Sequence, residues 1–201
     1  RSPGRVYKLT RDGAFVWLAA FGSFGNGRNP GSGLVQASDG SFYGTSASGG
    51  TSNLGTVFRI TADGALTRLV SFSGIDGRTP NGELLAANDG NVYGTTRMGG
   101  LGFDPAKNAV GSGTVFKVAA DGTFASLVSF SGVDGSAPNG NLLPGSDGNF
   151  YGTTSQGGPG FDLAKYKYGA GTVFKITPSG TLTTLASFEN TEAVYPTGPL
   201  L

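Results

Sequence analysis

Gly171-Thr172-Val173-Phe174-Lys175-Ile176 is one of four copies of a six-residue pattern in this 201-residue chain: glycine, any residue, valine, aromatic, basic, aliphatic. The other copies begin at Gly4, Gly55 and Gly113, so the spacings are 51, 58 and 58 residues. Self-similarity at such a period is typical of repeat proteins, in which each repeat is one supersecondary unit. The chain is therefore expected to consist of repeated units.

Two further motifs recur between these copies in a constant order. An Asp-Gly-x-x-Tyr-Gly-Thr motif occupies residues 39–45, 89–95 and 147–153, and a Leu-Val-Ser-Phe-Ser-Gly motif occupies residues 69–74 and 127–132, with a looser copy at 185–188. Three motifs in one order define a unit of about 58 residues. Each unit must then repeat one arrangement of strands and turns.

Within one unit, four short segments are rich in β-branched and aromatic residues and are bounded by glycine. They are residues 33–38, 41–45, 56–61 and 66–72. Asp39-Gly40 and Asp63-Gly64 suit tight hairpin turns between neighbouring strands. The pattern predicts an all-β fold of β-propeller-like tandem four-stranded antiparallel blades. A β-solenoid or a stack of independent hairpins is the alternative.

The repeat divides the chain into one repeat domain, residues 1–201, with three whole units and partial units at both ends. The expected units are about 1–29 (half a blade), 30–79, 80–137, 138–195 and 196–201 (the first strand of a further blade). Propellers usually have about 4 to 8 blades. A longer protein with more blades is favoured; a four-bladed ring with an incomplete blade and a combination of two copies stay open.

Composition excludes several classes of chemistry. The 14 Lys+Arg and 13 Asp+Glu give a net charge of +1, which does not suit a nucleic-acid binder. Without cysteine or histidine, neither a thiolate nor an imidazole can act as a metal ligand or catalyst. No apolar run is long enough for a membrane helix, and acidic residues are too sparse for Ca²⁺. We expect no metal, no cofactor, no nucleic-acid partner and no membrane insertion in this segment.

The repeats resemble a known family, the bacterial GloVer (Gloeobacter/Verrucomicrobia) tandem repeats of secreted and surface proteins. The motifs that carry this resemblance are residues 127–132, 147–154 and 171–177. The resemblance covers nearly the whole chain. It implies export to the outside of the bacterial cell or to its surface, more repeats than are present here, and a sorting signal elsewhere in the full protein.

Because strands alternate in direction, the connections divide between two faces of the molecule. One face has only tight Asp-Gly turns, whereas the other has loops of different lengths. Binding residues concentrate on such loops. The candidates on this loop face are Asp76, Arg78, Asn81, Asp104, Lys107, Asp134, Asn139, Asp162, Lys165, Tyr166 and Tyr168.

In a binding site, Tyr166 or Tyr168 would stack on a sugar or side chain while the Asp, Asn and Lys side chains form hydrogen bonds. Alternatively, the Asp and Asn side chains only cap their own turns, and Phe103 and Phe161 only fill gaps between blades. The sequence favours this structural role for the Phe-Asp pairs and leaves the role of the two tyrosines open.

The sequence has no catalytic constellation, and we therefore expect a non-enzyme: an extracellular binding or surface-structural module, with a glycan or protein ligand on the loop face. One alternative is a self-assembling component of a fibre or surface layer, joined through incomplete terminal blades. Another is a polysaccharide-degrading enzyme on a propeller scaffold, with Glu189 and Glu192 as paired acids.

Overall fold

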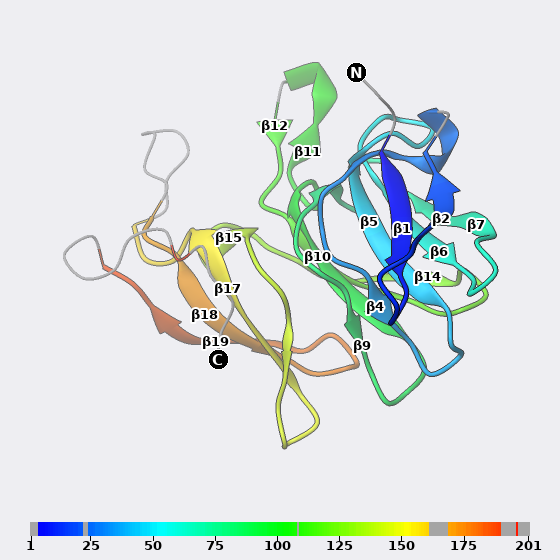
Figure 1. Ribbon diagram of the computed structural model, residues 1–201. Helices are drawn as coiled ribbons and strands as arrows, with labels where there is room; N and C mark the ends of the chain where they lie inside the picture. Colours follow the sequence, from blue (N-terminus) through cyan, green and yellow to red (C-terminus); the bar gives the residue numbers. More distant parts are fainter. Residues whose placement is uncertain (1–3, 22–23, 108, 161–168, 190–195, 197–201) are drawn as a thin grey trace.

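The computed structural model describes residues 4–21, 24–107, 109–160, 169–189 and 196. In these residues the fold is all-β and antiparallel, with two short 3-10 turns, η1 (Phe24–Asn26) and η2 (Pro105–Lys107), and no α-helix. None of the helical segments described is long and apolar enough to cross a bilayer. The predicted fold class is confirmed at this level (Figure 1).

Three sheets follow one another along the chain, and each has five strands. The first sheet contains β3 (Arg28–Pro30), β4 (Val35–Gln36), β5 (Phe42–Ser48), β6 (Thr56–Ile60) and β7 (Leu66–Ser71). The second contains β8 (Arg78–Pro80), β9 (Leu85–Ala86), β10 (Val92–Met98), β13 (Thr114–Val118) and β14 (Phe124–Ser129). The third contains β15 (Ser136–Pro138), β16 (Leu143–Pro144), β17 (Phe150–Gln156), β18 (Thr172–Ile176) and β19 (Leu182–Ser187).

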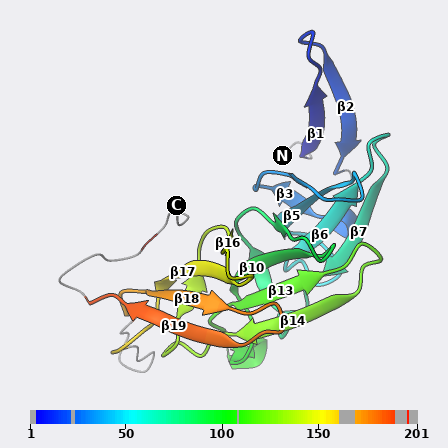
Figure 2. The same ribbon diagram turned by 90° about the horizontal axis from the view of Figure 1, so that it is seen from below.

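Two hairpins stand beside these sheets. β1 (Arg5–Leu9) pairs with β2 (Phe15–Ala20), and β11 (Phe103–Asp104) pairs with β12 (Ala109–Val110). Figure 2 shows the β1–β2 hairpin projecting from the first sheet. One side of this hairpin packs on the first sheet through Val6 and Phe21, which join Phe58 and Ile60 in a small core.

The four-stranded unit predicted from the sequence needs correction, because the first strand of each sheet is split in two. In the second sheet, β10 pairs with β8 through Thr96 and Pro80 and with β9 through Val92 and Ala86. Between them the chain leaves the ladder at Gly82, whose φ of 107° a glycine adopts without strain. The three-residue segments that end in proline were missed because they resemble loop sequence.

The hydrophobic core lies between neighbouring sheets. Val57 and Val70 of the first sheet share a buried cluster with Val92, Phe116 and Val118 of the second. A matching cluster joins the second sheet to the third, and its members include Tyr93, Val115, Phe150, Phe174 and Ile176. Both faces of the second sheet are therefore buried, which explains why its strands carry apolar side chains in both directions.

An uncommon backbone conformation repeats at the middle residue of the first strand of each sheet. Asn29, Thr79 and Ala137 have φ values of 53°, 52° and 52°. The N–H of Thr79 donates to the carbonyl oxygen of Leu54 at 2.8 Å, and that of Ala137 donates to Ser112 at 2.9 Å. Each hydrogen bond ties a sheet to the loop of the preceding sheet, which offsets the cost of the left-handed conformation.

Candidate functional site

The first strands of the three sheets lie close together. Each first strand is split in two, and polar side chains between the two halves meet in this region. We call this region, residues 28–36, 78–86 and 136–144, the inner edge. Contacts between β5 and β8 and between β10 and β15 place each first strand against the preceding sheet. Because equivalent positions of the repeat meet, a polar residue in one unit lies beside its counterpart in the next.

Two hydrogen-bonded pairs join the second and third sheets at the inner edge. Nδ2 of Asn81 donates to Oδ1 of Asn139 at 2.5 Å. Two residues further on, the N–H of Glu83 donates to Oδ1 of Asn141 at 2.8 Å, and Nδ2 of Asn141 donates to Oε2 of Glu83 at 3.2 Å. The two residues of each pair are 58 positions apart in the sequence, which is the length of one repeat.

On its other side the Glu83 carboxylate reaches the first sheet. A Cβ atom on Gly33, the equivalent position there, would collide with Oε1 of Glu83. Glu83 and Asn81 are exposed, whereas Asn139 and Asn141 are half-buried. The single carboxylate of Glu83 thus lies between the first and third sheets, on a residue that is exposed to solvent. We call Asn81, Glu83, Asn139 and Asn141 the inner-edge cluster.

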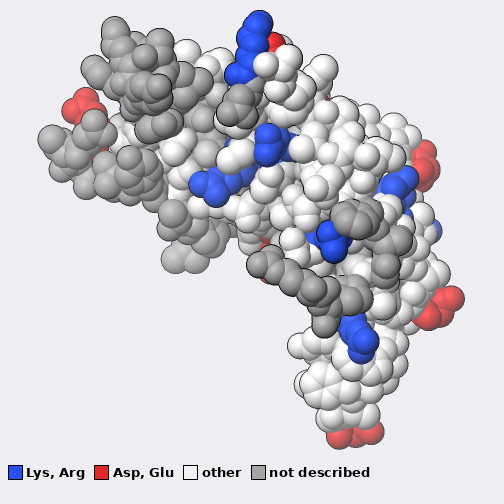
Figure 3. Space-filling model, turned by 90° about the horizontal axis from the view of Figure 1, so that it is seen from above, with Lys and Arg blue, Asp and Glu red and all other residues white. Residues whose placement is uncertain are grey.

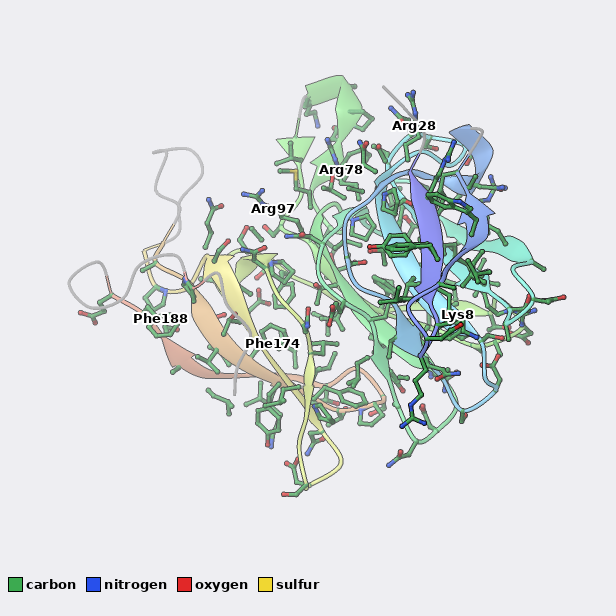
Figure 4. All side chains as sticks on the ribbon, in the orientation of Figure 1. Lys8, Arg28, Arg78, Arg97, Phe174 and Phe188 are labelled. Carbon is green, nitrogen blue, oxygen red and sulfur yellow. The ribbon has the colours of Figure 1, made fainter. Side chains whose placement is uncertain are left out.

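Arginines mark one end of the inner edge. Arg28 and Arg78 are the first residues of β3 and β8, and Arg97 is next to Met98, which pairs with Arg78. Figure 4 shows the three side chains in a row at the end of the molecule that bears the loops. Seen from that end, Lys and Arg side chains spread across the face, and most Asp and Glu side chains lie near its margin (Figure 3).

Phe103 of the β11–β12 hairpin lies over this arginine end. The Cζ atom of Arg78 is 5.9 Å from the centroid of the Phe103 ring, and the ring also covers Gly74, where a Cβ would collide with it. The long loop of the second sheet therefore holds an aromatic ring against the guanidinium of Arg78. Phe103 has a packing role, the structural alternative considered from the sequence.

The structure brings together some of the predicted binding residues and engages others in their own turns. Asn81 and Asn139 are paired at the inner edge. Asp76 accepts the N–H of Ser73 at 2.7 Å, and Asp134 accepts the N–H of Ser131 at 2.8 Å. These two carboxylates therefore stabilise the turns that lead into the first strands.

Asp104 is engaged in a similar way within the β11–β12 hairpin. It accepts the N–H of Ala106 at 3.0 Å and forms an ion pair with Nζ of Lys107 at 3.2 Å. The opposite charges of Asp104 and Lys107 therefore largely neutralise each other. Four predicted residues lie outside the described part of the chain: Asp162, Lys165, Tyr166 and Tyr168.

Glu83, Asn141, Arg28 and Arg97 are functional candidates that sequence reasoning missed. The sequence contained a signal for two of these four residues. Glu83 and Asn141 stand at equivalent positions of the repeat, and each precedes an apolar pair, Leu84-Leu85 or Leu142-Leu143. A polar residue that recurs at one position of an otherwise apolar segment indicates a shared environment. This position was not selected because it was assigned to the start of a strand.

The opposite face of the molecule has the uniform turns that the sequence predicts. In each sheet a tyrosine hydroxyl donates to the aspartate of its Asp-Gly turn; for Tyr93 and Asp89 the distance is 2.6 Å. Burial, followed by this hydrogen bond, raises the pKa of Tyr93. Hydrogen bonds from Asn149 and Tyr151 lower the pKa of Asp147. These aspartates are thus committed to the turns.

A pocket of about 350 Å³ lies on this turn face between the second and third sheets, lined by Ala86, Ala87, Asn88, Asp89, Pro144, Gly145, Gly148, Asn149, Phe150 and Pro178. At the corresponding junction of the first and second sheets, Nη1 of Arg59 reaches across to the carbonyl oxygen of Ala120 at 3.1 Å. Lys117 is the equivalent of Arg59 in the repeat. The pocket is mostly apolar, and its one carboxylate, Asp89, is already bonded to Tyr93.

In the described part of the chain, no three acidic residues gather as they would around a metal ion. The inner-edge cluster offers one carboxylate and three amides. A divalent cation such as Ca²⁺ takes about 6 to 8 oxygen ligands and favours more than one carboxylate. The donor set therefore suits a polar organic ligand better than a metal ion.

The fold and the inner edge define a propeller-like all-β repeat protein. The chain belongs to the family described as the Gloeobacter/Verrucomicrobia repeat, whose model matches residues 1–201. The resemblance inferred from the motifs is thus confirmed. A search of curated proteins found no match.

Several solved structures resemble the chain. A putative gluconolactonase is 18% identical with a TM-score of 0.55, over 91% of this chain and 56% of the other. A gluconolactonase from Xanthomonas campestris is 17% identical with a TM-score of 0.51, over 90% of this chain and 54% of the other. The chain thus spans about half the length of these neighbours. These identities establish the propeller-like fold only.

This finding corrects the function expected from the sequence. The chain was expected to be a non-catalytic extracellular binding or surface-structural module, with self-assembly as one alternative. The folds that resemble it are those of enzymes, which contradicts that expectation. The expectation of a non-enzyme rested on the lack of histidine and cysteine and has no support from these neighbours, since carboxylates can also act in acid–base chemistry.

Proposed function

We propose that the chain carries the substrate site of a propeller hydrolase that opens the lactone of a polyhydroxylated acid. The observation that carries this proposal is the position of Glu83, an exposed residue whose carboxylate accepts a hydrogen bond from Asn141, with the amide pair of Asn81 and Asn139 two residues earlier in the sequence. Lactones of this kind are small, uncharged at the reacting group and rich in hydroxyls, so they suit a polar cluster with one base.

The chemistry requires a base for water and donors for the oxyanion. Oε2 of Glu83 accepts from Asn141, while Oε1 has no hydrogen-bond partner in the described residues. Oε1 is therefore the atom that takes a proton from water as the water oxygen attacks the lactone carbonyl. When the ring C–O bond breaks, the same proton passes to the departing alkoxide, and the product is a hydroxy acid.

Asn139 is placed to assist this step. Its Oδ1 accepts from Asn81, so its Nδ2 can donate to the carbonyl oxygen of a substrate. A donor held by a neighbouring amide keeps its orientation as charge develops on that oxygen, which lowers the barrier. Asn81 and Asn139 thus act as a positioned pair, and Glu83 and Asn141 form the base and its support.

The names of the similar structures agree with this proposal, since two of them are gluconolactonases. Their likeness supports the scaffold, and the substrate class is our inference. The chain spans 56% and 54% of their lengths, so the proposal concerns the part of a hydrolase that these residues form.

The proposal is tested by measuring acid release from glucono-δ-lactone at constant pH, after subtraction of the reaction in buffer. Glu83→Gln keeps the shape of the side chain but removes the base, and we expect kcat to fall by about 10²-fold or more with a smaller change in KM. Glu189→Gln, at an exposed residue outside the inner edge, is expected to keep the wild-type rate. A wild-type protein no faster than buffer, or a fully active Glu83→Gln, would contradict the proposal.

We further propose that residues 1–201 act as one repeat domain, with whole units at about 30–79, 80–137 and 138–195, and that the protein works outside the bacterial cell. Shared cores between consecutive sheets support the first statement, and the repeat family supports the second. Limited proteolysis should leave the three units in one fragment, and fractionation of the native cells should recover the protein outside the cytoplasm.

A further inference from the structure

The arginine end of the inner edge carries positive charges that have no role in the proposed hydrolysis. Arg28 and Arg78 stand at equivalent positions of two consecutive units, and the third unit has Ser136 there. Arg97 enters the same region from β10, the strand that pairs with β8. Two adjacent sheets thus direct guanidinium groups to one end of the molecule, as Figure 4 shows for the labelled residues.

Arg78 and Arg97 have no carboxylate partner within the part of the chain that the structure describes. The described acidic residues of this region, Asp76 and Asp104, are bonded to Ser73 and Lys107. Nε of Arg78 is buried without a hydrogen-bond partner, and its guanidinium is held by the ring of Phe103. An arginine that is oriented by packing and is not neutralised by an acid is suited to bind an anion from outside.

The arginine end is close to the inner-edge cluster. Arg78 is the first residue of β8, and Asn81 directly follows the last residue of that strand. One ligand can therefore contact both the arginine end and the inner-edge cluster. The arginines also raise the local concentration of anions near the inner-edge cluster, because like charges spread over the same face add to one field.

We propose that Arg78 and Arg97 bind the oxyanion of an acidic sugar ligand, either a carboxylate or a phosphate, whose other end lies at the inner-edge cluster. This inference rests on the proposed function and refines it: the substrate is a lactone that itself carries a negative charge. The guanidinium groups donate hydrogen bonds to the two or three oxygens of the anion, as arginine does in bidentate pairs.

The test measures binding directly, with isothermal titration calorimetry on the full chain. The probes are D-glucuronate for a carboxylate away from the reacting carbon, inorganic phosphate for a phosphate, and D-glucose as the uncharged comparison. We expect at least one of the two anions to bind, D-glucose to bind at least tenfold more weakly, and the affinity of the anion to fall when the ionic strength is raised. The anion that binds more tightly identifies the oxyanion of the substrate.

The variant that tests the residues is Arg78→Gln combined with Arg97→Gln, which should weaken anion binding about tenfold or more. The matched control is Lys8→Gln combined with Arg11→Gln, which removes the same charge from the β1–β2 hairpin and should leave the affinity unchanged. Circular dichroism confirms that each variant is folded. Equal affinity in wild type and in the Arg78 and Arg97 variant, or no anion binding by the wild type, would overturn the inference.

Failure of this inference and failure of the proposed function give different results. Anion binding that depends on Arg78 and Arg97, in a protein that does not hydrolyse lactones, would support the anion site and reject the hydrolase. Hydrolysis of glucono-δ-lactone by a protein that binds neither anion would support the hydrolase and reject the anion site. Glu83→Gln separates them further, since it should lower kcat for hydrolysis by about 10²-fold or more and keep anion binding.

Discussion

The carboxylate of Glu83 occupies the space that a side chain on Gly33 would need, although the two residues are in different sheets. Asn141 of the third sheet holds the same carboxylate from the other side. Three consecutive repeats therefore place a glycine, a glutamate and an asparagine at one equivalent position. The repeat builds a site by varying this position, while the surrounding strands stay nearly constant.

The buried threonine pairs give a prediction for stability. Oγ1 of Thr96 and Oγ1 of Thr114 lie 2.8 Å apart, both side chains are fully buried, and Thr114 also donates to the carbonyl oxygen of Asp76 at 3.2 Å. Thr114→Val removes the donor to the carbonyl oxygen of Asp76, whereas Oγ1 of Thr96 keeps the carbonyl oxygen of Met98 as its acceptor, and the substitution should cost about 1–3 kcal/mol in urea unfolding. Ser46→Ala is the control, since Oγ of Ser46 has no hydrogen-bond partner in the described residues, and it should cost clearly less.

The left-handed conformation at Thr79 predicts a stabilising change. A β-branched residue at a φ of 52° is strained, whereas asparagine tolerates this region and is present at the equivalent Asn29. Thr79→Asn should therefore raise the free energy of unfolding by about 0.5–1 kcal/mol. Thr183→Asn, on the exposed side of β19, should lower it slightly because asparagine is a poor strand former. A loss of stability in Thr79→Asn would contradict the explanation.

The hydrogen bond between Tyr93 and Asp89 predicts how stability changes with pH. Burial and this hydrogen bond raise the pKa of Tyr93 above its ordinary value near 10, so the folded protein keeps the proton that the unfolded chain releases. The contribution of Tyr93 to the free energy of unfolding is fully present below about pH 10 and falls as the pH rises further. In Tyr93→Phe the alkaline decline in the free energy of unfolding should be shallower; parallel declines in the two proteins would contradict the assignment.

The sequence was sufficient for the part of the fold that the repeat determines. The spacing of Gly55, Gly113 and Gly171 and the alternation of Val57 and Phe58 predicted antiparallel sheets buried on both faces, because each such feature depends only on residues near in sequence. The split first strand could not be predicted in this way. It depends on which residues the preceding sheet meets, as in the hydrogen bond from Thr79 to Leu54.

The same difference between local interactions and contacts between sheets explains which site residues the sequence could predict. Loops that vary in length were visible in the sequence, and the candidates on them were selected for that reason. Asp76, Asp104 and Asp134 then proved to be bonded within their own turns, which are local interactions. Glu83 and Asn141 meet only because two repeats place equivalent positions side by side, and that juxtaposition requires the three-dimensional arrangement of the sheets.

The most direct test of the account is the rate of glucono-δ-lactone hydrolysis by Gly33→Ala. The three atoms nearest to the new Cβ all belong to the flexible side chain of Glu83, so the fold should be kept, with a change in unfolding free energy of about 1 kcal/mol or less, while the base is displaced. We predict a fall in kcat/KM of about tenfold or more with a melting temperature close to that of the wild type. Wild-type kcat/KM in a folded Gly33→Ala protein would contradict the assignment of Glu83 as the base.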